Sequence, residues 1–205
     1  MIIILKKIID KYNLDIRGVL HIGAHYGQEY KDYSEQGIKN MIFFEPIANS
    51  YKKLLENVPN NKCIKTYNLA LGNKVEDKIM YCAEMNQGQS NSLLKPYLHE
   101  IYSPAIAFND REMVQVERLD NIKFDRKLFN MINIDVQGYE LEVFKGAVKT
   151  LKSIDVIYSE VNFEELYVGC VHVEDLDAFL GKFGFVRILT DSSPKSWGDA
   201  LYLKY

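Results

Sequence analysis

Short apolar runs and longer amphipathic stretches alternate along most of this chain. The apolar runs are GVLHIG (18–23), NMIFFEP (40–46), CIKTYNLAL (63–71), LFNMINIDV (128–136) and IDVIYSEV (154–161). Runs of this length and composition are typical of strands that are buried on both faces of a parallel sheet. The alternation of strand-like and helix-like segments therefore predicts an α/β fold around a parallel sheet.

The stretches between the strands have helical spacing. We expect helices over 29–37, 48–58, 140–152 and 173–184. Within 140–152, the side chains of Leu141, Phe144, Val148 and Leu151 recur at helical intervals, so this face is expected to pack on the sheet. A further amphipathic helix is expected within 1–17.

Two parts of the chain depart from this alternation. At the C-terminus, FVRILTD (185–191) and DALYLKY (199–205) are expected to form two strands that finish the sheet with an antiparallel pair. In the region 77–119, two strand-like segments enclose a long loop over 85–110, which we interpret as a candidate lid because loops of this length are more often functional than incidental. No linker separates these parts, so residues 1–205 are expected to form one domain.

Composition narrows the classes of function. The 205 residues carry a formal net charge of -3, and the pI is about 5.9, so we expect no nucleic-acid partner. The three cysteines have no CxxC spacing, which indicates reduced thiols and a cytoplasmic protein. Lys6 and Lys7 interrupt the apolar N-terminus, no run reaches transmembrane length, and no membrane partner is expected. The oligomeric state is left open.

The turn after the first strand is the first candidate for chemistry. Gly23 and Gly27 let the backbone approach a ligand closely, and the helix that follows directs its N-terminal amides toward that ligand. Glu45 ends the second strand about 20 residues later, where Rossmann-type sites place a carboxylate for ribose. The turn HIGAHYG lacks the third glycine of GxGxxG, which disfavours pyrophosphate and favours S-adenosylmethionine.

Several segments occur in the order seen in FkbM-type methyltransferases. They are VLHIGAHYGQE, IFFEP, NLALGN, SNSLL, VERLDNI, INIDVQGYELEVFKGA and IYSEV, and the resemblance covers roughly residues 17–165. It implies a class I methyltransferase fold, which is a Rossmann-like, mostly parallel seven-stranded sheet with an antiparallel last strand and helices on both faces. It also implies an enzyme that uses S-adenosylmethionine to methylate a hydroxyl of a sugar, a glycan or another small molecule.

The resemblance also implies a set of cofactor-binding residues. Gly23, Ala24, His25 and Gly27 would form the turn around the methionine moiety, Glu45 would bind ribose, and Ala70 and Leu71 would lie near adenine. Glu29 is expected to reach the ammonium group of the cofactor, although a helix N-terminus favours acidic residues for electrostatic reasons alone. Asn91 and Ser92, in the long loop, are expected to touch the cofactor or the acceptor.

Asp135 is the first candidate for a catalytic base. It ends an apolar strand at the carboxyl edge of the sheet, where a buried carboxylate is costly unless it has a partner, and it is also expected to contact the cofactor. Glu160, at the end of the next strand, is the second candidate. Asp135 could instead cap the amides around Gly138. Asn133 and Gln137 stand where many family members have Lys and Glu, which places in doubt a mechanism that needs those charges.

Other ligands and functions are weighed against this interpretation. We expect no metal, although Asp135, Glu160 and Asn162 offer oxygen ligands that suit magnesium. His21 and His25 span a turn rather than one helix face, and His21 is expected to be packed and hydrogen-bonded. Aromatic side chains in and after the long loop, at Tyr97, Tyr102, Phe108, Phe163 and Tyr167, suit either an acceptor wall or the packing of a lid.

The alternative functions are an RNA ribose 2'-O-methyltransferase, a non-catalytic binding module with a methyltransferase fold, and a small NAD-dependent reductase. Asn133 and the acidic pI argue against the first, and the missing third glycine argues against the last. Transfer of a labelled methyl group separates an enzyme from a binding module.

Overall fold

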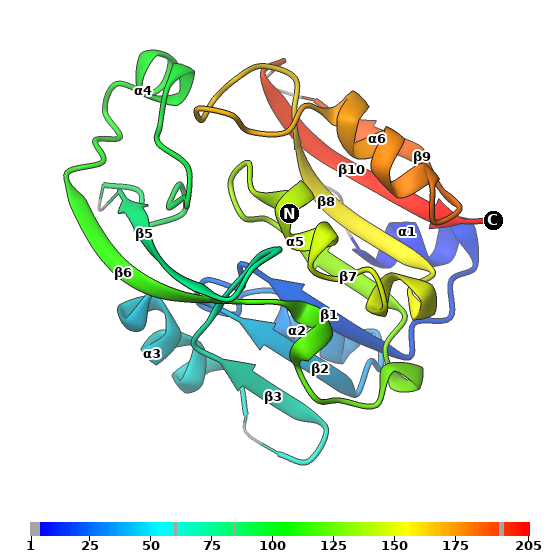
Figure 1. The fold of residues 1–205 in the computed structure, drawn as a ribbon. Helices are drawn as coiled ribbons and strands as arrows, with labels where there is room; N and C mark the ends of the chain where they lie inside the picture. The colour runs from blue at the N-terminus through cyan, green and yellow to red at the C-terminus, as the bar shows by residue number, and fades with distance from the viewer. Residues whose placement is uncertain (1–4, 60, 84, 193–194) are drawn as a thin grey trace.

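A computed structural model describes residues 5–59, 61–83, 85–192 and 195–205. Its main sheet has seven strands in the order β3-β2-β1-β7-β8-β10-β9 (Figure 1). These are β1 (Gly18–Ile22), β2 (Asn40–Phe44), β3 (Ile64–Tyr67), β7 (Met131–Ile134), β8 (Val156–Asn162), β9 (Phe185–Asp191) and β10 (Trp197–Lys204). Strand β10 pairs antiparallel with β8 and β9, and the other pairs are parallel. The expected sheet with an antiparallel last strand is confirmed.

Helices cover both faces of this sheet. The α-helices are α1 (Leu5–Tyr12), α2 (Tyr30–Glu35), α3 (Ala48–Asn57), α4 (Leu98–Tyr102), α5 (Glu140–Lys145) and α6 (Val173–Gly181). Helices α1, α2 and α3 bury Leu5, Tyr33 and Leu54 in one core cluster, while α5 and α6 bury Phe144 and Leu180 in another. Every residue of β1, β7 and β8 is buried, which explains why most residues of these strands are apolar.

The run CIKTYNLAL is not one strand, contrary to expectation. Its first part is β3, and Ala70–Leu71 form β4 in a separate three-stranded sheet with β5 (Glu76–Cys82) and β6 (Asp110–Glu117), in the order β4-β6-β5. Asn68 causes the break, because its side-chain amide donates to the carbonyl oxygens of Glu45 and Pro46 at 2.9 and 2.8 Å. In Figure 1 the small sheet and α4 lie on the opposite side of the molecule from β9 and β10.

The helix expected over 140–152 ends at Lys145. A Cβ atom on Gly146 would lie 1.9 Å from the carbonyl oxygen of Gly72, so the chain passes close to the small sheet here. It resumes as a 3-10 helix, Thr150–Ser153, whose first amide donates to Asp120 Oδ1 at 2.9 Å. Val148, expected on the packed face, is therefore 36% exposed.

The remaining elements differ from expectation mainly at their ends. Helices α2 and α6 are shorter than 29–37 and 173–184, and the last strand begins at Trp197, inside the expected turn. The expected N-terminal helix is Leu5–Tyr12, and residues 1–4 lie outside the described part of the chain. Further 3-10 helices span Leu119–Asn121 and Arg126–Leu128. The long loop contains α4, and its interpretation as a lid stays a prediction.

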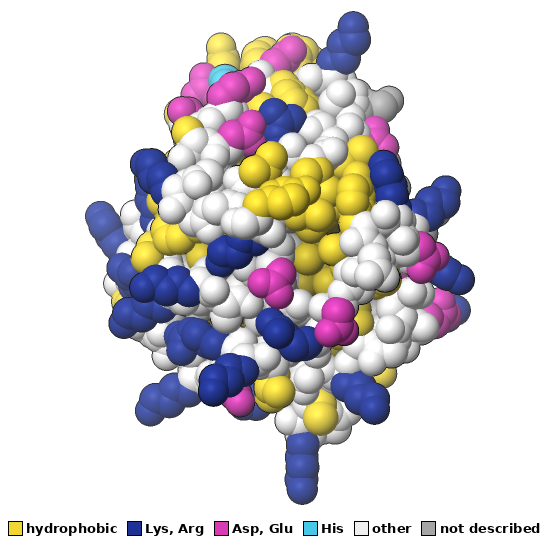
Figure 2. All heavy atoms as spheres, turned by 90° about the vertical axis from the view of Figure 1, so that its right-hand side faces the viewer, with side chains coloured by type: hydrophobic (Ala, Val, Ile, Leu, Met, Phe, Trp, Pro, Cys, Tyr) yellow, Lys and Arg dark blue, Asp and Glu magenta, His cyan; other side chains and the backbone are white. Residues whose placement is uncertain are grey.

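The face on the right of Figure 1 carries a patch of hydrophobic side chains with basic and acidic side chains around it (Figure 2). In the described ranges, every helix is too short or too polar to cross a bilayer.

Candidate active site

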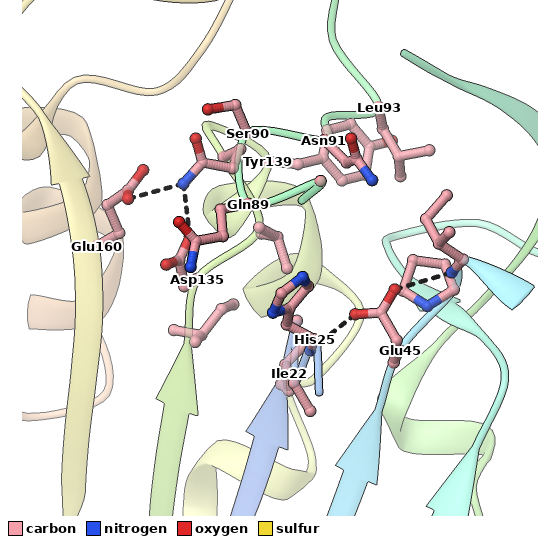
Figure 3. A pocket seen from close by; sticks show the side chains of 18 of the residues that line it. Ile22, His25, Glu45, Gln89, Ser90, Asn91, Leu93, Asp135, Tyr139 and Glu160 are labelled. Atoms are coloured by element: carbon pink, nitrogen blue, oxygen red, sulfur yellow. Dashed lines mark hydrogen bonds between the residues drawn. The ribbon is translucent and has the colours of Figure 1, made fainter. Parts of the chain in front are cut away.

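A cavity of about 500 Å³ lies at the carboxyl ends of β1, β2, β7 and β8. This edge is where open parallel sheets bind their ligands. Most of the residues expected to bind the cofactor or to act in catalysis line it, namely Gly23, Ala24, His25, Glu29, Glu45, Ala70, Leu71, Asp135 and Glu160. Figure 3 shows that Asp135 and Glu160 lie toward one end of the cavity and Glu45 toward the other.

Glu45 fastens the turn after β1 to the end of β2. Its Oε2 accepts a hydrogen bond from the amide of His25, and its Oε1 accepts one from the amide of Ile47, both at 2.8 Å. The side chain is 6% exposed, and burial raises its pKa to about 7. Because each carboxylate oxygen has more than one lone pair, Glu45 can still accept hydrogen bonds from hydroxyls in the cavity.

An apolar wall stands beside Glu45. It is formed by Ile47, Leu69, Ala70, Leu71, Met80 and Leu93. The cavity therefore offers a matching surface to each part of a nucleoside. The turn and the carboxylate of Glu45 provide hydrogen-bond donors and acceptors for polar substituents, and the apolar wall suits a base. The residues present therefore fit S-adenosylmethionine, which carries no phosphate.

Asp135 and Glu160 share a single amide group at the other end of the cavity. The side-chain nitrogen of Gln137 donates to Asp135 Oδ1 and to Glu160 Oε2, each at 2.8 Å (Figure 3). The side-chain oxygen of Gln137 accepts a hydrogen bond from the Tyr167 hydroxyl at 2.7 Å. Desolvation by the surrounding protein raises the pKa of Asp135 to about 6, and burial raises the pKa of Glu160 well above its ordinary value. A pKa of about 6 leaves Asp135 mostly ionised at neutral pH.

The alternative in which Asp135 caps the amides around Gly138 is wrong. Those amides are held by Glu140, whose Oε1 accepts hydrogen bonds from Val136 at 3.1 Å and from Gly138 at 3.2 Å. The oxygens of Asp135 are consequently left to Gln137 and to the cavity.

Comparison with known proteins agrees with this geometry. Residues 21–187 match the model of the methyltransferase FkbM domain family. The chain belongs to this family. A relative in Sinorhizobium fredii, the 2-O-methyltransferase NoeI, is 25% identical over 177 residues, which are 82% of this chain and 72% of the relative.

Solved structures share the fold of this FkbM-domain methyltransferase. One is Sp1610 of Streptococcus pneumoniae, a candidate tRNA (m1A22) methyltransferase whose structure was determined in complex with S-adenosyl-L-methionine. The two structures superpose with a TM-score of 0.55 at 14% sequence identity, and the match covers 100% of this chain and 73% of the Sp1610 chain. Another is the magnesium protoporphyrin IX methyltransferase of Synechocystis with bound S-adenosylmethionine. It has a TM-score of 0.54 at 8% sequence identity, and the match covers 98% of this chain and 76% of the Synechocystis chain. The expected class I fold is confirmed, and so is the assignment to S-adenosylmethionine-dependent methyltransferases.

Two residues expected at the cofactor lie behind the cavity instead. A Cβ atom on Gly27 would come within 2.7 Å of the side chains of Leu54 and Val58, so this glycine lets α3 pack against the turn. The hydroxyl of Ser92 is buried and donates to the carbonyl oxygen of Gln137 at 2.7 Å, which fastens the long loop to the turn after β7. Asn91, its neighbour, does line the cavity (Figure 3).

Asn133 belongs to a buried hydrogen-bonded network. Its amide nitrogen donates to the Tyr33 hydroxyl at 2.6 Å, and that hydroxyl is 3.2 Å from His21 Nδ1. Burial lowers the pKa of His21, which favours the neutral form of its imidazole. The expectation that His21 is packed and hydrogen-bonded is confirmed.

Sequence reasoning missed the contribution of the last strand. Trp197 and Asp199 of β10 line the cavity, and Asp199 stands opposite Glu160 in the sheet. The Tyr158 hydroxyl donates to Asp199. No motif marks these residues, because they reach the site through the insertion of β10 beside β8. Sequence reasoning also missed a contact between the long loop and the turn after β1. His25 Nε2 lies 2.8 Å from the carbonyl oxygen of Gln87.

Replacing Gln137 with Glu is expected to move the pH dependence of methyl transfer. In the parent, the rate should rise with pH through about 6 as Asp135 loses its proton. The variant loses the amide hydrogens and places a third carboxyl group beside the pair, so the pKa of Asp135 should increase and the rise should shift upward by about one pH unit or more.

A pH–rate profile tests this expectation, with Gln115→Glu as the control. Gln115 is exposed on β6 and lies outside the cavity lining, so its replacement adds the same charge without touching the carboxyl pair. Identical shifts in both variants would contradict a specific role of Gln137.

Proposed function

We propose that this chain transfers a methyl group from S-adenosylmethionine to a hydroxyl oxygen of a sugar, a glycan or another small molecule. The observation that carries the proposal is Asp135 at the end of the cavity, with its pKa raised to about 6 and its orientation fixed by Gln137. Such a carboxylate suits the removal of a proton from a hydroxyl. The similarity to a 2-O-methyltransferase supports oxygen as the acceptor atom.

The polar and apolar ends of the cavity suggest how the cofactor is held. We assign the methionine moiety to the backbone of Gly23, Ala24 and His25, the ribose hydroxyls to Glu45, and adenine to the wall that contains Ala70 and Leu71. Glu29 faces the same cavity and is the residue to which we assign the ammonium group. Asp135 completes the set at the end of β7.

The residues of the chain then have separate tasks in the reaction. When bound, S-adenosylmethionine supplies a methyl group on a positively charged sulfur, and the electrons of the broken bond stay on that sulfur. Asp135 accepts the proton of the acceptor hydroxyl while the oxygen forms its bond to carbon. Gln137 holds Asp135 in position and also donates a hydrogen bond to Glu160, whose pKa is raised well above its ordinary value by burial. Alignment of the reactants provides much of the remaining rate enhancement.

An RNA acceptor is a weaker candidate for this site. Within the described part of the chain, the lining of the main cavity contains no Lys or Arg. A ribose 2'-hydroxyl arrives with flanking phosphates, which need cationic partners near the reacting oxygen. The solved tRNA methyltransferase relative is 14% identical and supports the fold only.

Replacing Glu45 with Ala tests the cofactor site. The change removes the acceptor that we assign to ribose, together with the contacts to His25 and Ile47, so the affinity for S-adenosylmethionine should fall by roughly 10- to 100-fold. Calorimetric titration of the parent and the variant measures this difference.

Glu112→Ala is the matched control. Glu112 accepts a hydrogen bond from the amide of Ala48 at 3.0 Å, so it lies close to the same strand end but outside the cavity lining. Its removal should leave the affinity within about twofold. If the parent binds no cofactor, the proposed function is wrong; if Glu45→Ala binds as tightly as the parent, only the ribose assignment is wrong. Transfer of a labelled methyl group to an acceptor excludes the non-catalytic alternative.

A further inference from the structure

A second cavity, of about 370 Å³, adjoins the cofactor cavity. The two share four lining residues, His99, Ser103, Leu166 and Trp197, and the second is also lined by Tyr102, Glu164, Lys195 and Ser196. Because the shared residues form a common border, a molecule held in the second cavity can extend one of its groups into the first.

The second cavity lies on the side of Asp135. Trp197 begins β10, and two residues further along the same strand Asp199 stands opposite Glu160. Glu160 is joined to Asp135 through the amide of Gln137. The surfaces assigned to ribose and adenine are at the other end, beside Glu45 (Figure 3). A molecule that enters over Trp197 therefore meets the carboxyl pair first.

The charges around this path select against anions. Five carboxyl groups line the main cavity, those of Glu29, Glu45, Asp135, Glu160 and Asp199, and the second cavity adds Glu164. Of the described residues that line either cavity, Lys195 is the single Lys or Arg. A phosphate or carboxylate drawn toward Asp135 would lose its hydration and meet mostly carboxyl groups, which is unfavourable.

The surfaces of the second cavity suit an uncharged ring with several hydroxyl groups. Trp197 and Tyr102 offer flat aromatic faces, and the Tyr102 hydroxyl donates to Glu164 Oε2. Glu164 and Ser103 offer oxygen acceptors to hydroxyl groups. We infer that this second cavity receives the acceptor as an uncharged sugar unit, and that the carboxyl groups around the path to Asp135 reject phosphorylated sugars and sugar acids. The inference rests on the proposed function and specifies its substrate.

Trp197 allows direct measurement, because it is the one tryptophan in the chain. Its fluorescence is recorded while the S-adenosylmethionine-bound protein is titrated with neutral methyl glycosides and short neutral oligosaccharides, and separately with glucose 6-phosphate and glucuronic acid. We expect a saturable change in emission with the neutral sugars and, at the same concentrations, none with the two anions.

Two variants locate the response. Ser103→Phe places an aromatic ring at the border of the cavities, so it should abolish the response to neutral sugars while the calorimetric affinity for S-adenosylmethionine stays within about twofold. Ser34→Phe, on the exposed side of α2, is the control for an added ring. Glu164→Arg leaves the border intact and should create a response to glucose 6-phosphate.

The outcomes separate this inference from the proposed function. A protein that binds no S-adenosylmethionine overturns the proposed function. A protein that binds the cofactor but shows no response to any neutral sugar, or responds equally to the anions, overturns the inference alone. A folded Ser103→Phe variant that still responds to neutral sugars also overturns it.

Discussion

Replacing Asp135 with Asn is expected to lower the rate of methyl transfer by roughly 10²- to 10⁴-fold, the usual contribution of a general base. The asparagine side chain has the same size and keeps an oxygen that can accept the hydrogen bond from Gln137, now 2.8 Å from Asp135 Oδ1. It cannot accept the proton of a hydroxyl. The effect should therefore appear in the rate of the chemical step, with the affinity for S-adenosylmethionine changed by about tenfold at most.

Single-turnover transfer of a labelled methyl group measures the chemical step, and calorimetry measures cofactor affinity. The increase in rate with pH through about 6 should disappear in the variant, because the group that titrates is gone. Asp77→Asn is a suitable control, since Asp77 is exposed on β5, away from the cavity. A variant as active as the parent would exclude Asp135 as the base and direct attention to Glu160.

The central strands could be predicted because burial on both faces leaves a simple pattern. Strands β1, β7 and β8 are buried at every position, and most of their residues are apolar; the polar residues of β8 are concentrated toward its carboxyl end, at the site. Where other elements begin and end is determined by tertiary contacts that the local sequence does not reveal. The break between β3 and β4 depends on hydrogen bonds from Asn68 to the end of β2, and the early end of α5 depends on the approach of Gly146 to Gly72.

The same distinction applies to the site. Gly23, Glu45 and Asp135 could be predicted because each follows a parallel strand directly, and parallel strands bring their carboxyl ends to one edge. Gly27 also looked like part of the turn, but whether it faces the cavity or α3 depends on how that helix packs. Trp197 and Asp199 are far from every motif, and only the order of the strands, with β10 between β8 and β9, brings them to the carboxyl pair.

Gly23 lies where the turn after β1 meets the end of β7, which carries Asp135. Replacing Gly23 with Ala is expected to reduce the free energy of unfolding by roughly 2 to 5 kcal/mol. Its φ is +80°, and a Cβ atom would lie 1.8 Å from the carbonyl oxygen of Asp135. That oxygen belongs to the backbone, so it can move away only if the end of β7 separates from β1. The amide of Asp135 donates to the carbonyl oxygen of Ile22 at 3.0 Å and opposes this separation.

Gly37→Ala isolates the two causes of this loss. Gly37 has nearly the same backbone conformation, with a φ of +76°, but a Cβ atom there would meet nothing within 4 Å. In urea unfolding, Gly37→Ala should reduce the free energy of unfolding by about 1–2 kcal/mol. This is the cost of the left-handed backbone conformation alone. The excess in Gly23→Ala is then the cost of steric contact with the end of β7. Equal losses would mean that the contact between the cofactor turn and Asp135 is not tight. With a larger loss, any soluble Gly23→Ala protein should bind S-adenosylmethionine weakly, since the same movement displaces the turn from the carboxyl pair.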